Sequence, residues 1–136
     1  MLKKYCALML SFFIVFSLAA CGNVQNGVVG TWVVTSYENE ESEFSPDQIG
    51  ELYGETAQLY NKYSLIFTAS GNLTTIIPNF QDGSTHESKA TYTVQDGYIE
   101  VLYDPDDHSK YELVDYYDGK IRIEITSGLI AIFEKQ

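Results

Sequence analysis

Basic residues and proline are scarce in this chain. It holds 8 Lys and Arg against 19 Asp and Glu, a formal net charge of −11, and only 3 Pro among 136 residues. Because so acidic a surface would repel nucleic-acid phosphates, nucleic-acid binding is excluded. A disordered acidic tail is excluded as well, since aromatic residues make up 14% of the chain and supply the side chains of a core. The length corresponds to one domain and argues against a multidomain enzyme.

Charge is missing altogether from residues 5–20 (YCALMLSFFIVFSLAA), which follow Lys3 and Lys4. This apolar run is shorter than the roughly 20 residues that a membrane-spanning helix needs. A positive start, an apolar middle and a small-residue end predict a lipoprotein-type signal peptide over residues 1–20. Residues 18–21 (LAAC) carry that assignment, because they resemble the lipobox of bacterial lipoproteins, in which the cysteine thiol is diacylglycerol-modified and cleavage falls just before it.

Thiols are therefore expected to play no part in the mature fold. Cys6 leaves with the signal peptide and Cys21 becomes the lipidated N-terminus, so no disulfide, thiolate metal site or cysteine nucleophile remains. Removal of residues 1–20 leaves 6 basic and 19 acidic residues, a net charge of −13. We expect residues 21–29 to be the acylated cysteine and a short tether, which anchors the protein to the extracytoplasmic face of the cell membrane. The acidity should hold the body away from an anionic leaflet.

Beyond the tether, the hydrophobic pattern has a period of two. The expected strands are short and are separated by turns rich in Gly, Asp, Asn and Ser. They are Gly30–Ser36, Tyr63–Thr68, Leu73–Ile77, Lys89–Val94, Tyr98–Tyr103, Lys110–Tyr116, Lys120–Ile125 and Leu129–Glu134. Short connections between successive strands imply antiparallel neighbours, so the sequence predicts an all-β fold, an eight-stranded up-and-down barrel.

Alternation assigns the faces of these strands. Residues 120–125 (KIRIEI) place three isoleucines on one face and charged side chains on the other, which is typical of a half-buried strand. The same rule points a set of large apolar side chains inward: Leu65, Phe67, Tyr92, Val94, Ile99, Val101, Tyr103, Tyr111, Leu113, Ala131 and Phe133. The final strand is apolar on both faces, so we expect its outer face to be covered too.

One segment, Ser45–Tyr60, has the spacing of a short α-helix inserted between the first two strands. Ser45 can cap it, with Pro46 in the first helical position and Gln48 completing a capping box. Ile49, Leu52, Tyr53, Thr56 and Tyr60 then share one face. Two glycines in the segment each cost roughly 1 kcal/mol of helix stability, so the helix is expected to depend on docking.

Several short motifs occur in the order found in the lipocalin-like (calycin) family. They are Gly30-x-Trp32, Leu65-x-Phe67 leading into residues 70–72 (SGN), residues 119–121 (GKI) and Phe133-x-Lys135. The chain resembles the small bacterial lipoproteins of this family over residues 28–136. The resemblance implies a lipocalin-like barrel domain over residues 30–136, a binding scaffold, and a Trp32 that plugs one barrel end. Where lipocalins often pack a last-strand Arg over this Trp, the chain offers only Lys135.

A barrel of eight strands is either filled by side chains or holds one small ligand. For a ligand, the expected interior contacts are Trp32, Phe67, Tyr92, Tyr103 and Tyr111, with the lid helix supplying Ile49, Leu52 and Tyr53. Because alternation places Arg122 outward, an inward carboxylate would lack a bidentate partner, so the ligand should be neutral or cationic rather than a fatty acid. The alternative is a fully packed barrel whose acidic, Tyr-bearing face docks a cationic envelope protein as an interaction or inhibitor module.

The sequence offers no pattern for catalysis, metal or cofactor. Residues 104–108 (DPDDH) gather three carboxylates in one turn but lack the glycine and the bidentate Glu of an EF-hand loop. His86 and His108 stand in expected loops without cysteine, and two histidines seldom make a zinc site. No nucleophile and base occur at a defined spacing. We therefore predict a binding protein that is not an enzyme and that has no metal site and no cofactor.

Overall fold

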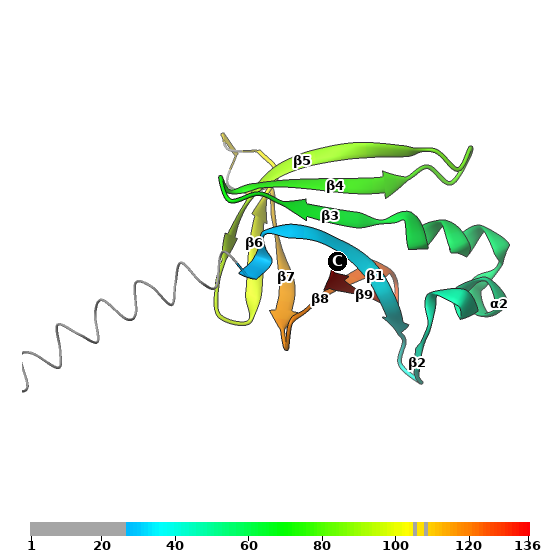
Figure 1. Ribbon diagram of the computed structural model, residues 1–136. Helices are drawn as coiled ribbons and strands as arrows, with labels where there is room; N and C mark the ends of the chain where they lie inside the picture. Colours follow the sequence, from blue (N-terminus) through cyan, green and yellow to red (C-terminus); the bar gives the residue numbers. More distant parts are fainter. Residues whose placement is uncertain (1–26, 105, 108) are drawn as a thin grey trace, which may run out of the picture.

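The computed structural model describes residues 27–104, 106–107 and 109–136. Residues 1–20, Cys21 and the first part of the tether lie outside the described residues. Within them the chain forms nine strands and a three-part helical insert (Figure 1). In chain order these are β1 (Gly30–Glu38), β2 (Glu43–Phe44), η1 (Pro46–Gln48), α2 (Ile49–Tyr53), η2 (Glu55–Lys62), β3 (Ser64–Phe67), β4 (Asn72–Pro78), β5 (Thr85–Val94), β6 (Tyr98–Leu102), β7 (Tyr111–Tyr117), β8 (Lys120–Thr126) and β9 (Leu129–Lys135).

Eight of the strands close into an antiparallel barrel. The sheet order is β2-β1-β3-β4-β5-β6-β7-β8-β9, and pairing of β1 with β9 completes the ring. β2 is a two-residue strand attached to the end of β1, where Phe44 pairs with Tyr37. The all-β fold, the eight barrel strands and the short helix after the first strand are therefore confirmed. One boundary is corrected: β5 begins at Thr85 rather than Lys89, because it pairs with β4 as far as Pro78.

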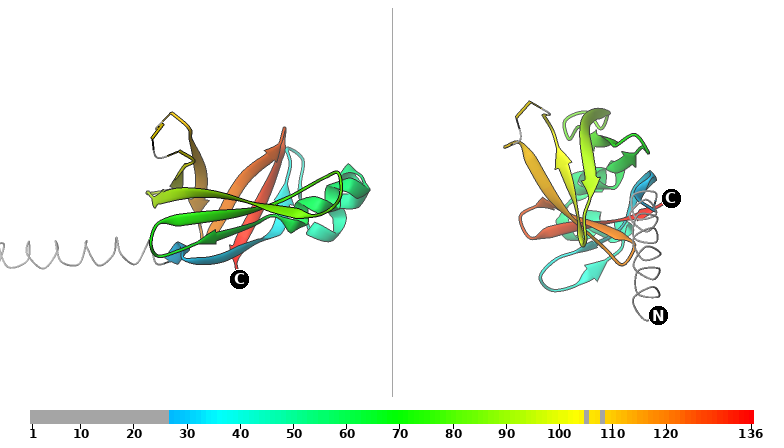
Figure 2. Two further views of the ribbon diagram at one scale, coloured as in Figure 1. Left: turned by 90° about the horizontal axis from the view of Figure 1, so that it is seen from above. Right: turned by 90° about the vertical axis from the view of Figure 1, so that its left-hand side faces the viewer.

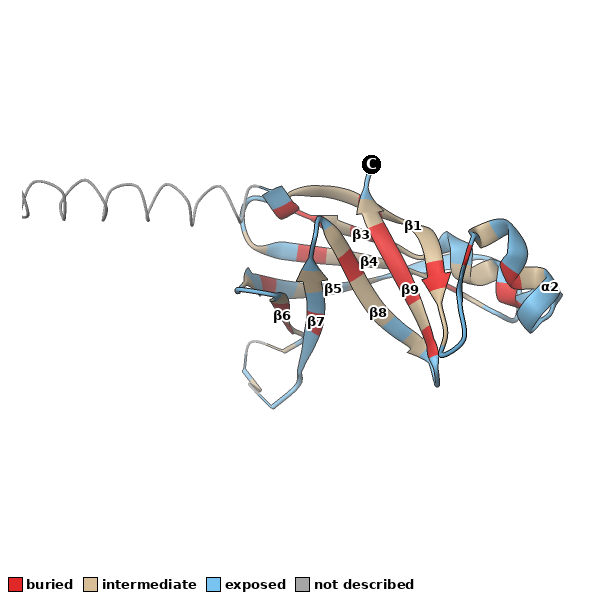
Figure 3. Cartoon of the chain, turned by 90° about the horizontal axis from the view of Figure 1, so that it is seen from below, coloured by how far each residue is buried: buried red, intermediate tan, exposed pale blue. Residues whose placement is uncertain are grey.

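The barrel wall is weakest between β7 and β8. These strands pair only through residues 115–117 and 120–122. Residues 111–114 and 123–126 therefore face each other without a hydrogen-bonded ladder, and Figure 3 shows the two strands meeting at one end and diverging toward the other. We call this unpaired stretch the β7–β8 opening; Glu112 and Val114 of β7 and Ile123 and Glu124 of β8 line the barrel interior along it.

Trp32 closes the end of the barrel at which β1 begins. Its side chain is 2% exposed, and its indole N–H donates a hydrogen bond to the Val28 carbonyl at 2.8 Å. The ring makes edge contacts with Phe67 and Tyr116, at centroid distances of 6.5 and 5.9 Å. Val28, which the sequence assigns to the tether, is fully buried here, so the folded body starts before β1. This burial and these contacts agree with the plugging role that the resemblance implies for Trp32.

The helical insert is broken rather than continuous. Gln48 accepts a hydrogen bond from the Ser45 backbone N–H at 3.0 Å, as the predicted capping box requires. The single helix expected over residues 45–60 is corrected to η1, α2 and η2, because Gly54 has a φ of +100°, which turns the chain. The insert lies at the end of the barrel away from the start of β1, as two views agree (Figures 1 and 2).

Aromatic stacking attaches this insert to the barrel. Phe44 stacks between Tyr37 and Tyr53, at centroid distances of 5.6 and 5.8 Å. Tyr37 is buried, and its hydroxyl donates to the Asn61 side-chain oxygen at 2.6 Å. This burial raises the pKa of the Tyr37 hydroxyl, so the group stays a neutral donor. These contacts dock the insert on the barrel.

Candidate ligand-binding site

The barrel interior contains a cavity of about 210 Å³ between the Trp32 end and the β7–β8 opening. An engineered 150 Å³ cavity in another protein holds benzene, so by proportion this one holds about eight heavy atoms. Most of the wall is apolar: Leu65, Phe67, Leu73, Ile77, Ile99, Val101, Val114, Ile123, Ile125 and Phe133. The remaining lining side chains are polar: Tyr63, Thr75, Tyr103, Glu112 and Glu124. Side chains therefore do not fill the interior. The alternative of a fully packed core required them to fill it.

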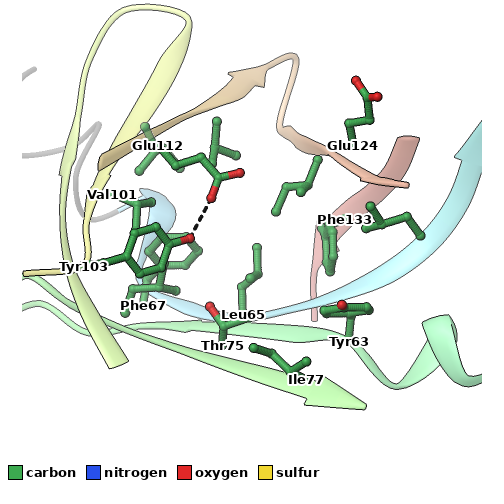
Figure 4. A pocket seen from close by; sticks show the side chains of 15 residues that line it. Tyr63, Leu65, Phe67, Thr75, Ile77, Val101, Tyr103, Glu112, Glu124 and Phe133 are labelled. Carbon is green, nitrogen blue, oxygen red and sulfur yellow. Dashed lines mark hydrogen bonds between the residues drawn. The ribbon is translucent and has the colours of Figure 1, made fainter. Parts of the chain in front are cut away.

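The polar side of the cavity is built on β6 and β7 (Figure 4). The Tyr103 hydroxyl donates a hydrogen bond to the Glu112 carboxylate at 2.6 Å. Partial burial and the adjacent negative charge raise the pKa of Tyr103, so its hydroxyl remains protonated and the hydrogen bond keeps its donor. Tyr103 is 44% exposed, which places the pair at the mouth of the cavity.

Glu124 lies on the other side of the same mouth. It comes from β8, and its carboxylate accepts a hydrogen bond from the Gly128 backbone N–H at 3.3 Å. In Figure 4 this carboxylate points away from Tyr103 and Glu112. The two glutamates thus make the mouth acidic from both sides of the β7–β8 opening, while only Glu112 is directed toward Tyr103.

Two of the five predicted interior contacts line the cavity, namely Phe67 and Tyr103. Trp32 and Tyr92 are buried beneath Phe67, which they contact edge-on at 6.5 and 4.8 Å. Tyr92 also donates its hydroxyl to the Thr68 carbonyl at 2.6 Å. Trp32 and Tyr92 thus support the floor of the cavity and are not among its lining residues.

The predicted inward orientation of Tyr111 and Leu113 is wrong. Val114 is buried against the core, so strand alternation turns Glu112 inward and leaves Tyr111 and Leu113 outside, 53% and 56% exposed. The sequence alone was misleading because β7 (YELVDYY) carries apolar side chains on both of its faces. The residue that could have indicated the inward face is Val114, which lies on the same face of β7 as Glu112 and Tyr116. Reading β7 in that phase would have identified Glu112 as a carboxylate on the cavity side of the strand.

The predicted lid residues do not reach the cavity. Ile49 is fully buried, but Leu52 and Tyr53 are 57% and 43% exposed. Among the residues that line the cavity, the nearest to the insert along the chain is Tyr63, which directly follows η2. The insert therefore contributes no side chain to the cavity wall, and its predicted lid face is interrupted because Gly54 ends α2 directly after Tyr53.

The acidic turn after β6 is held by its own hydrogen bonds. The Asp107 carboxylate accepts from the Ser109 hydroxyl and backbone N–H, which lowers the pKa of Asp107. Pro105 and His108 lie outside the described residues. Over the described ranges, no group of three or more His, Cys, Asp or Glu side chains is placed to hold a metal ion. In that same part of the chain, no helix has the length and apolar character needed to span a membrane.

Comparison with known proteins identifies the fold. No family model matches the chain, and no curated protein matches it. Among solved structures, it is similar to a lipocalin-like protein from Bacteroides uniformis, with 15% identity and a TM-score of 0.52 over 81% of this chain and 99% of that one. An uncharacterized protein from Bacteroides eggerthii aligns with 15% identity and a TM-score of 0.47, over 79% and 98% of the two chains. The chain thus has the closed, eight-stranded antiparallel barrel of a lipocalin-like protein.

Proposed function

We propose that the protein binds a small, mostly apolar ligand inside the barrel. The observation that carries this proposal is the cavity of about 210 Å³, which has an apolar wall and a few polar groups gathered at its mouth. Ligand sites commonly combine these two features. The lipocalin-like fold is consistent with such a role, and we infer binding rather than catalysis.

The lining chemistry favours a neutral or cationic ligand. Among the side chains that line the cavity, the charged ones are Glu112 and Glu124. Arg122 stands outside the barrel with its guanidinium 4.0 Å from the centre of the Tyr117 ring. A ligand carboxylate would meet like charge at the mouth without a compensating cation, which is unfavourable.

A cavity-filling variant tests the binding proposal. Val101→Phe adds bulk at a lining position, while Leu102→Phe places the same ring on the opposite face of β6 and serves as the control. With the full-length protein in lipid vesicles, titration calorimetry with 2-phenylethanol should show saturable binding that Val101→Phe abolishes and Leu102→Phe preserves. Equal binding by both variants, with circular dichroism showing both folded, would place the ligand elsewhere.

We further propose that a lipid on Cys21 holds the protein on the extracytoplasmic face of the cell membrane. The support is the LAAC sequence at residues 18–21 and the burial of Val28, seven residues after Cys21. Seven residues span at most about 25 Å, so the barrel would stay close to the membrane. Cys21→Ala should release the protein from the membrane fraction, whereas Cys6→Ala should not. A Cys21→Ala variant that stays membrane-bound contradicts this anchoring.

A second candidate function is docking of a cationic envelope protein. The observation that favours it is the exposed outer face of β7, where Tyr111, Leu113 and Tyr117 stand beside acidic side chains. Capture of a partner from envelope extract should weaken at high salt if charge drives the contact. Capture that is insensitive to salt, or that survives Leu113→Ser, counts against this candidate.

A further inference from the structure

We propose that the cavity selects a monocationic amine, with the ammonium group at Glu112 and Tyr103 and an aromatic ring or short alkyl chain inside. The inference rests on the proposed ligand-binding function and names the ligand class. It starts from an exposed carboxylate that lines the mouth of a largely apolar cavity and is hydrogen-bonded to Tyr103.

Glu112 has accepting capacity to spare. A carboxylate offers about four lone-pair sites, and within the described ranges the Tyr103 hydroxyl is the hydrogen-bond partner that Glu112 has. No Lys or Arg from those ranges forms an ion pair with it. An ammonium group at this exposed mouth brings three donors and a positive charge to the Glu112 carboxylate.

Tyr103 fixes the direction of that carboxylate. It follows directly after β6, whose residue Leu102 pairs with Tyr111 of β7, so Tyr103 and Glu112 project inward from adjacent strands. The 2.6 Å hydrogen bond occupies one carboxylate oxygen and leaves the other free for an ammonium donor. The Tyr103 ring at the mouth can also contact the cation through its π face. The recognition pair is thus organised before the ligand arrives.

The cavity size narrows the ligand further. A volume of about 210 Å³ accommodates a phenyl ring and a two-carbon linker, about eight heavy atoms by proportion to the benzene cavity. The nitrogen then falls at the mouth, beside Glu112. The net charge of −11 adds a long-range field that concentrates cations at the surface.

The test compares three probes of one shape with different charge. These are 2-phenylethylammonium, neutral 2-phenylethanol and anionic 3-phenylpropionate, titrated at pH 7 into the full-length protein in vesicles. Since a hydrogen bond to a charged group is worth more than a neutral one, we expect the ammonium probe to bind about tenfold or more tightly than the alcohol. The anion should bind most weakly.

Glu112→Gln should abolish the preference for the ammonium probe, so that this variant binds 2-phenylethylammonium and 2-phenylethanol with equal affinity. Glu100→Gln, on the outward face of neighbouring β6, is the matched control and should keep the preference. Far-UV circular dichroism checks that both variants are folded.

The outcomes separate the two proposals. Equal affinities for the ammonium probe and the alcohol, or a preference that survives Glu112→Gln, overturn amine selection and leave ligand binding standing. If none of the three probes binds the wild-type protein, both proposals are overturned.

Discussion

Replacing Trp32 with Phe should destabilise the fold without changing the ligand site. Trp32 is almost fully buried at the closed barrel end and is absent from the cavity lining. The substitution keeps an aromatic ring against Phe67 and Tyr116 but removes the indole N–H that donates to the Val28 carbonyl. A variant that separates stability from binding therefore tests whether Trp32 is a plug or a ligand contact.

The magnitude follows from two terms. Phenyl is smaller than indole by roughly 40 Å² of buried surface, which is worth about 1 kcal/mol. Val28 is fully buried, so its carbonyl loses its hydrogen-bond partner in a dry environment, which costs about 1–3 kcal/mol. We expect the free energy of unfolding to fall by about 2–4 kcal/mol in total. Because domains of this size have about 5–15 kcal/mol of stability, the variant should still fold.

Urea denaturation followed by far-UV circular dichroism measures this loss, since the variant has no tryptophan left to report by fluorescence. With a denaturant slope of about 2 kcal/mol per molar, the midpoint should drop by about 1–2 M. Tyr117→Phe, which alters an exposed ring, is the control and should stay within about 0.5 kcal/mol.

Two results would refute the reasoning. A Trp32→Phe midpoint equal to that of wild type would mean that the closed end does not depend on this hydrogen bond. A tenfold loss of 2-phenylethanol affinity in the still-folded variant would mean that Trp32 belongs to the ligand site.

Three further predictions concern the backbone, pH and the outer face. Gly30 has a φ of +137°, and an added Cβ would lie 2.8 Å from the Lys135 side chain, so Gly30→Ala should cost about 1–3 kcal/mol in urea denaturation; an unchanged midpoint would contradict this. The pKa of Tyr37 is raised in the folded state, so the native protein keeps this proton where the unfolded chain loses it. The contribution of Tyr37 to stability should therefore be constant below about pH 10 and fall above it, so stability above about pH 10 should fall less steeply in Tyr37→Phe; identical profiles in that alkaline range for the two proteins would be inconsistent with this linkage. Tyr111→Ser on the outer face should leave 2-phenylethanol affinity unchanged by calorimetry, and a clear loss would return Tyr111 to the site.

The strands were predictable because their signal is local. Apolar residues recur with period two between glycine-containing turns, and this pattern placed all eight barrel strands and the direction of Phe67 and Phe133. β2 was missed because a two-residue strand has no period to detect. The insert was located from Ser45, Pro46 and Gln48, but its break was not, because a glycine adopts positive φ only where the surrounding packing requires it.

The sequence by itself determined the strand order, the antiparallel barrel and the acidic character of the molecule, since each depends on neighbouring residues or on composition. Only the tertiary structure decided which face of β7 is inside, because both faces carry apolar side chains and the buried position of Val114 selects one. That choice moved Tyr111 to the surface and brought Glu112 beside Tyr103. The cavity itself is likewise a tertiary property, since it depends on how β7 and β8 diverge and on the volume that side chains from eight strands leave between them.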